Sequence, residues 1–208
     1  MTRIPLPRAV AAALLLAVAL LFVPHPGAAA VFDPETVTLQ NGMQVVVVTN
    51  DRAPVVTHMV WYRAGAMDEP AGRTGVAHLL EHLMFKGTKR FPDGQFSEIV
   101  ARNGGRENAF TGQDYTGYFQ SVAADRLELM MELESDRMTN LILSQEDIDT
   151  EREVVLEERR SRVENDPSAR LSEQTNAAMY MSHPYRNPVI GWAYELKSIT
   201  RDDLERFY

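Results

Sequence analysis

The chain has 208 residues, enough for one ordinary domain or a small pair of domains. Its 45% hydrophobic and 24% charged residues can fill a core, and its formal charge of −8 argues against a nucleic-acid partner, because no basic stripe neutralises phosphates. It has no cysteine, which excludes a disulfide scaffold and a lipid anchor on cysteine.

The first thirty residues resemble a secretory signal peptide. A leader with two arginines precedes an uninterrupted apolar run from Ala9 to Val23, and the small residues at 28–30 suit a signal peptidase. The alternative is an uncleaved membrane anchor, but fifteen apolar residues are short of the roughly 20 that span a bilayer. We expect a mature chain that begins near Val31, is exported to the periplasm or the medium, and has no stable membrane association.

Residue periodicity predicts the elements of the mature chain, residues 31–208. Asn41-Gly42 between β-rich runs is a strong hairpin signal, because both residues tolerate the positive φ of such turns. Strands are expected at 37–39, 43–49, 55–63, 107–111 and 115–122, and a loop at 65–75. Helices are expected at 76–85, 96–102, 124–140, 145–164, 168–181 and 201–208. Strands followed by helices indicate an α+β domain.

The strongest chemical signal is the run His78-Leu79-Leu80-Glu81-His82. Residues four apart lie on one face of a helix, so both histidines can bind one metal ion, and Glu81 can reach a water bound to that ion. Two imidazoles and a carboxylate suit zinc, and a catalytic zinc keeps one position open for water. Glu81 would take the proton of that water and later pass it to the leaving amine. The order His-x-x-Glu-His is the inverzincin motif.

A solvated helix face that happens to carry two histidines would show the same pattern. The apolar neighbours argue against this reading, because they predict a largely buried helix, and buried histidines and carboxylates need partners. These neighbours are Val76, Leu79, Leu80, Leu83 and Met84. We therefore favour a metal site.

The third ligand is expected from the helix at 145–164. This helix carries Glu151, Glu153, Glu157 and Glu158. Spacing alone does not choose between Glu157 and Glu158, and it does not reject ordinary surface acids that are balanced by the neighbouring arginines.

The run from His78 to Thr88, together with the run from Glu151 to Glu158, resembles the pitrilysin/insulinase family of zinc metallopeptidases, which includes the mitochondrial processing peptidases. The resemblance extends from about Val37 to the end of the chain. It implies an antiparallel-rich sheet packed by helices, as in the N-terminal half-domain of these enzymes. It also implies one zinc ion and the hydrolysis of unfolded peptides.

The resemblance assigns further residues. The third zinc ligand of the family falls on Glu158, with Glu157 as the second choice, and the acid that steadies a ligand histidine falls on Glu151. The stretch from Asn108 to Thr111 corresponds to an exposed edge strand to which the substrate peptide adds, so Asn108 and Ala109 are the expected substrate-binding residues.

Two other functions compete with a peptidase. S-ribosylhomocysteine lyases share the motif but use a cysteine as third ligand, and this chain has none. A non-catalytic or partner-dependent subunit is the second alternative, because family members carry a second, related half that closes over the substrate. We expect residues 31–208 to be an N-terminal catalytic portion that is incomplete at its C-terminal end. A second half or a partner chain would supply the rest.

Overall fold

The computed structural model describes residues 33–92 and 94–208. They belong to two compact units, and the boundary lies between Ala53 and Pro54. The expected signal peptide and the cleavage point before Val31 lie outside the described residues. Within the described ranges, no helix is long and apolar enough to span a bilayer.

The first unit contributes one antiparallel hairpin, β1 (Glu35–Thr38) with β2 (Gln44–Val47). The hairpin predicted from Asn-Gly is confirmed, and the N–H of Gly42 closes the turn on the carbonyl of Leu39 at 2.9 Å. Only the glycine adopts a positive φ, of 87°. The expectation for Asn41 was wrong, because its side-chain oxygen instead accepts the backbone N–H two residues later, which holds the turn without a left-handed asparagine.

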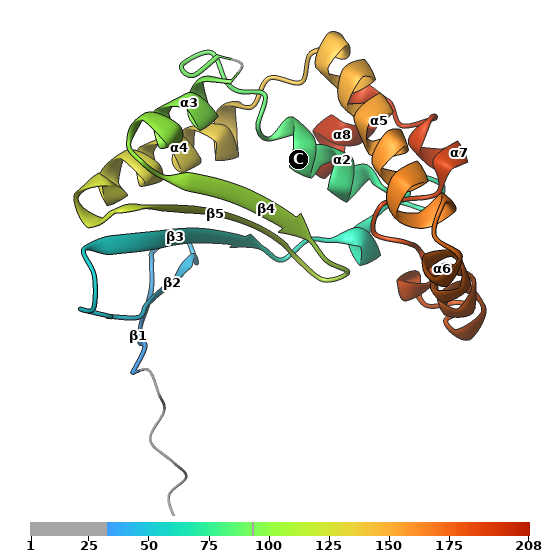
Figure 1. Cartoon of the computed structure of the whole chain (residues 1–208), viewed down its shortest axis with the longest axis horizontal. Helices are drawn as coiled ribbons and strands as arrows, with labels where there is room; N and C mark the ends of the chain where they lie inside the picture. Colours follow the sequence, from blue (N-terminus) through green and yellow to red (C-terminus); the bar gives the residue numbers. More distant parts are fainter. Residues whose placement is uncertain (1–32, 93) are drawn as a thin grey trace, which may run out of the picture. The chain divides into compact units, whose positions relative to one another are not determined.

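The second unit contains an antiparallel sheet of β3 (Val55–Tyr62), β5 (Thr116–Ala123) and β4 (Arg106–Thr111), in that spatial order (Figure 1). The strand pair predicted at 107–111 and 115–122 is therefore confirmed to within one residue. Among residues 33–92 and 94–208, β4 pairs only with β5, so its other edge is open in the part of the chain that the structure describes.

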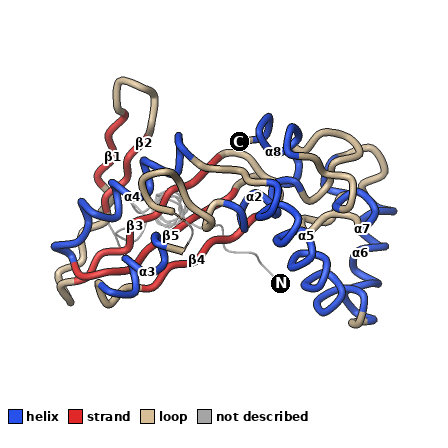
Figure 2. The backbone as a smooth tube through the Cα atoms, turned by 90° about the horizontal axis from the view of Figure 1, so that it is seen from above, coloured by secondary structure: helices blue, strands red, loops and turns tan. Residues whose placement is uncertain are grey.

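Seven α-helices are described beside the strands (Figures 1 and 2). They are α2 (Val76–Leu83), α3 (Gln95–Arg102), α4 (Leu127–Asn140), α5 (Gln145–Arg159), α6 (Pro167–Met179), α7 (Ala193–Leu196) and α8 (Arg201–Phe207). Six were predicted, and α7 was not, because four residues show no helical period. The α+β class is confirmed, with α3 and α4 packed on the strands and α2 between β4 and α5.

Several predicted boundaries were wrong because short non-α turns replace α-helix or loop. The expected loop at 65–75 contains the 3-10 turn η1 (Ala66–Asp68), and the start of the expected helix at 124–140 is the 3-10 turn η2 (Ala124–Arg126). The helix expected at 145–164 ends in a π-helical turn, η3 (Arg160–Glu164). A further 3-10 turn, η4 (Pro184–Arg186), follows α6.

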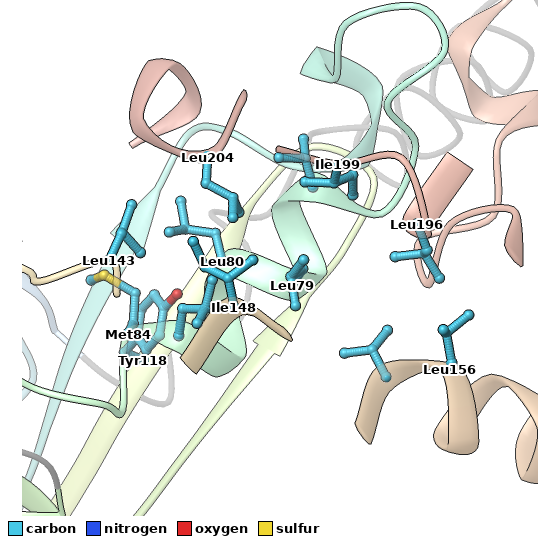
Figure 3. Packing of buried hydrophobic residues seen from close by; sticks show 13 residues of the cluster. Leu79, Leu80, Met84, Tyr118, Leu143, Ile148, Leu156, Leu196, Ile199 and Leu204 are labelled. Atoms are coloured by element: carbon cyan, nitrogen blue, oxygen red, sulfur yellow. The ribbon is translucent and has the colours of Figure 1, made fainter. Parts of the chain in front are cut away.

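Helix α2 is the centre of the main core (Figure 3). Its apolar residues contact side chains from α5, α7 and α8, and the five neighbours predicted to be buried are at most 8% exposed. Burial of each large aliphatic side chain stabilises the fold by roughly 1.5–3 kcal/mol, so α2 is held firmly. This prediction of a buried helix is confirmed.

The start of α2 depends on a buried carboxylate and on a glycine. Gly75, the residue before the helix, has a φ of 90° and no side chain to cap the helix. Glu69 replaces the missing cap, because its carboxylate accepts the N–H groups of Gly75 and Ala77, each at 3.0 Å. A Cβ on Gly75 would lie 2.6 Å from Cδ2 of Leu196, so a larger residue does not fit.

Candidate metal centre

The structure brings His78, His82 and Glu158 together. Oε2 of Glu158 lies 3.7 Å from Nε2 of His78 and 3.5 Å from Nε2 of His82, and the three residues offer ligand atoms that all lie within 4.8 Å of one another. Zinc bonds of 2.0–2.2 Å in a tetrahedron separate neighbouring ligand atoms by about 3.4 Å. The geometry of this donor set therefore fits one zinc ion after small side-chain shifts.

Two helices position the three side chains. His78 and His82 are one turn apart on α2, and their rings lie 4.9 Å apart between centroids. Glu158 comes from the last turn of α5, which packs against α2 through Val155 and Leu156. The apolar side chains of both helices enter the core. His78, His82 and Glu158 therefore face one another at the edge of the core.

The structure also separates the two candidates for the third ligand. The side chain of Glu158 is 17% exposed and faces the histidines. The side chain of Glu157 is 65% exposed and pairs with Arg160. Arg162, on the π-helical turn η3, holds Oε1 of Glu158 at 2.7 Å, which leaves Oε2 directed toward the histidines.

Glu151 holds the ring of His82 through the ring nitrogen that does not face the cluster. Its Nδ1 lies 3.0 Å from Oε2 of Glu151, and the other oxygen of that carboxylate accepts a bond from Nζ of Lys86 at 2.8 Å. Burial raises the pKa of Glu151, but the hydrogen bonds from Lys86 and His82 outweigh burial and lower it. An ionised Glu151 favours the tautomer of His82 that carries its proton on Nδ1, the tautomer that offers the lone pair of Nε2 to a metal.

His78 is neutral at pH 7. Burial, followed by the nearby His82 and Arg162, lowers its pKa to about 4. Its buried Nδ1 has no hydrogen-bond partner among the described residues. A neutral, desolvated imidazole is the form that binds zinc, so the chemistry of this residue fits a ligand as well as its position does.

Glu81 stands apart from this cluster. The hydroxyl of Thr111, the last residue of β4, donates a hydrogen bond to Oε2 of Glu81. Burial raises the pKa of the Glu81 carboxyl, while the Thr111 hydroxyl and His82 act in the opposite direction. This arrangement suits a carboxylate that exchanges protons rather than one that binds a metal.

The predicted substrate residues Asn108 and Ala109 lie in the middle of β4. The side-chain oxygen of Asn108 accepts the backbone N–H of Ala109 at 2.9 Å, and Ala109 packs against the core. The edge position of β4 agrees with the expected docking strand, whereas substrate binding itself stays a prediction.

Sequence reasoning missed three residues that support the site: Lys86, Thr111 and Arg162. Lys86 could not be found from spacing, because its contact with Glu151 joins elements that only the fold brings together. Arg162 was within reach, since it lies four residues after Glu158 in the helix predicted at 145–164. Thr111 shares a strand face with Ala109, but its contact with Glu81 depends on the fold.

Comparison with known proteins identifies the family of the chain. Residues 44–192 match the insulinase family, peptidase family M16. Zinc protease PqqE of Helicobacter pylori is 39% identical over 175 residues, which are 84% of this chain and 39% of that protein. A probable mitochondrial-processing peptidase subunit beta of Arabidopsis thaliana is 32% identical over 190 residues, 88% of this chain and 36% of that protein. The chain thus spans about two fifths of the length of these relatives.

Solved structures show the same fold. A protease from Helicobacter pylori is 38% identical with a TM-score of 0.81, and the match covers 85% of this chain and 43% of that one. The first half of the periplasmic protease PqqL from Escherichia coli is 26% identical with a TM-score of 0.76, over 86% and 40% of the two chains. The fold predicted from the resemblance is confirmed, and the chain belongs to the insulinase family of peptidases, family M16.

Proposed function

We propose that this chain is the zinc-binding, catalytic part of an endopeptidase that hydrolyses unfolded peptides. The observation that supports this most is the convergence of His78, His82 and Glu158 on one point, with the half-buried carboxylate of Glu81 next to His82 on the same helix. Similar proteins are named zinc proteases, and one ion matches the number of ligands present.

The residues divide the chemistry between them. A bound zinc ion would polarise the scissile carbonyl and acidify the attacking water. Glu81 would accept the proton of that water and donate it to the leaving amine. The open edge of β4 beside Asn108, where the backbone of Ala109 faces outward, would pair with the backbone of the substrate, a mode that favours extended peptides and reads little of their sequence.

Export and a second half belong to the same proposal. The pattern of residues 1–30 supports secretion, and the Escherichia coli neighbour PqqL is described as periplasmic. Because the chain spans about two fifths of its relatives, a second half-domain or a partner chain would cover the substrate. The same observation favours the second candidate function, a subunit that is inactive without its partner.

The test is Glu81→Gln, assayed on an unstructured peptide with the chain alone and with a second half from a relative. Loss of one general base lowers kcat by roughly 10²–10⁴, while KM and zinc content stay unchanged. Glu153→Gln, an exposed change of the same charge on α5, is the control and should be as active as wild type. A fully active Glu81→Gln protein would refute the mechanism. Cleavage by wild type only with the second half would support the partner-dependent subunit, and no cleavage in either form would support a non-catalytic one.

A further inference from the structure

At Thr111, the last residue of β4, the backbone and the side chain point in different directions. The N–H of Gly112 bonds to the carbonyl of Tyr115 at 2.7 Å and so closes the turn between β4 and β5. Hydrogen-bonded pairs alternate along an antiparallel ladder, so the next residue inward, Thr111, belongs to a pair without such bonds. The backbone N–H and C=O of Thr111 therefore point to the open edge of the sheet, as do those of Ala109.

The side chain of Thr111 points the other way. It lies on the face of the sheet that carries α2, where its hydroxyl donates to Oε2 of Glu81. A single residue thus offers its backbone to the edge where a peptide would dock and its hydroxyl to the proposed base. Among the described residues the hydrogen bond to Glu81 is made to Oε2, which leaves Oε1 to face a water molecule.

The position of Thr111 is fixed by its surroundings. The turn that follows it packs against the segment after β3, where the N–H of Ala66 donates to the carbonyl of Gly112 at 3.1 Å. The two backbones approach so closely that a Cβ on Gly65 would lie 2.6 Å from the carbonyl oxygens of Gly112 and Gln113. Such a tight contact between backbones leaves this end of β4 little room to move.

We propose that Thr111 is a positioning residue that holds the Glu81 carboxylate in register with a peptide docked on β4. This inference rests on the proposed role of Glu81 as the base. Without the hydroxyl, the carboxylate of Glu81 can rotate about its last side-chain bond, because such bonds have broad minima. Loss of a hydrogen bond to a charged group lowers a rate roughly ten- to hundredfold. The loss should appear in kcat and not in KM, because the backbone that docks the peptide is unchanged.

Thr111→Val and Thr111→Ser separate the hydroxyl from the shape of the side chain. Valine keeps the shape and loses the donor, and serine keeps the donor. We expect Thr111→Val to lower kcat roughly ten- to hundredfold with unchanged KM and zinc content, and Thr111→Ser to stay close to wild type. A Thr111→Val enzyme with wild-type kcat would overturn the proposal. If the valine variant does not fold, Thr111→Ala provides the same comparison.

A thermal cycle on the zinc-free chain tests the contact without any activity. It compares wild type, Thr111→Val, Glu81→Leu and the double variant. If the bond exists, Thr111→Val lowers Tm in the wild-type background and has little effect beside Glu81→Leu. Equal losses of Tm in both backgrounds would overturn the proposal. If wild type cleaves no peptide, the proposed function fails, and this cycle still decides whether the hydrogen bond between Thr111 and Glu81 exists.

Discussion

Replacement of Glu151 by glutamine should weaken zinc binding without removing a zinc ligand. The carboxylate accepts from His82 at 3.0 Å and from Lys86 at 2.8 Å, and its side chain is only 12% exposed, so solvent screens these bonds little. A glutamine offers one oxygen, which the cation of Lys86 attracts, and this turns the amide NH₂ toward His82. Both nitrogens then compete to donate, and the ring of His82 loses its fixed orientation.

The expected loss follows from the strength of the lost bond. A hydrogen bond to a charged group contributes about 1.5–3 kcal/mol, and each 1.4 kcal/mol is about a factor of ten in affinity. The dissociation constant for zinc should therefore rise roughly 10- to 100-fold, which is also the usual effect of removing a carboxylate behind a ligand histidine.

The assay is a competition between the protein and a chromophoric zinc chelator at pH 7. Glu153→Gln removes the same charge from an exposed position two residues away and should bind zinc like wild type. Circular dichroism checks that all variants are folded. Equal zinc affinities of the Glu151 and Glu153 variants would refute the idea that Glu151 orients His82.

Two further predictions concern stability. Burial raises the pKa of Asp203, but hydrogen bonds from Thr200 and two arginines outweigh it and lower the pKa to about 2. The resulting stabilisation, about 2 kcal/mol, is present above about pH 4 and is lost as pH falls through about 2. In urea unfolding, Asp203→Asn should therefore be less stable than wild type at pH 7 and equally stable near pH 2. Gly75→Ala should lower Tm and zinc affinity together, because the new Cβ meets Leu196 at 2.6 Å at the start of α2. Gly72 has a similar φ of 81°, but a Cβ there meets nothing within 4 Å. Gly72→Ala should therefore lower the free energy of unfolding only by the backbone cost, about 1–2 kcal/mol. An acid limb that is unchanged in the asparagine variant, or equal effects of the two alanine variants, would contradict these accounts.

Local signals predicted much of the fold. The hairpin at Asn41-Gly42 and the buried face of α2 follow from two turn residues and from a helical period, and both depend only on neighbours in sequence. The ends of α4 and α5 were misjudged because 3-10 and π turns preserve the apolar pattern of an α-helix over a few residues. The short helix α7 has too few residues for any period.

How much of the site the sequence could predict differs from residue to residue. The spacing of His78 and His82 defined their shared face, because both lie on one helix. The choice between Glu157 and Glu158 depends on how α5 is rotated relative to α2, which is a property of packing and not of spacing. The resemblance to a family supplied that choice. In the structure Oε2 of Glu158 lies 3.5 Å from Nε2 of His82, and its role as a ligand stays a prediction. The contact between Thr111 and Glu81 needed the register of the sheet.

Zinc content of two neighbouring variants tests the proposed metal centre. Wild-type protein, Glu157→Gln and Glu158→Gln are purified, dialysed against the same trace of zinc and measured by elemental analysis. We expect one zinc ion per chain for wild type and for Glu157→Gln, and little or none for Glu158→Gln. A Glu158→Gln protein that retains one zinc ion as firmly as wild type would contradict the proposed metal centre.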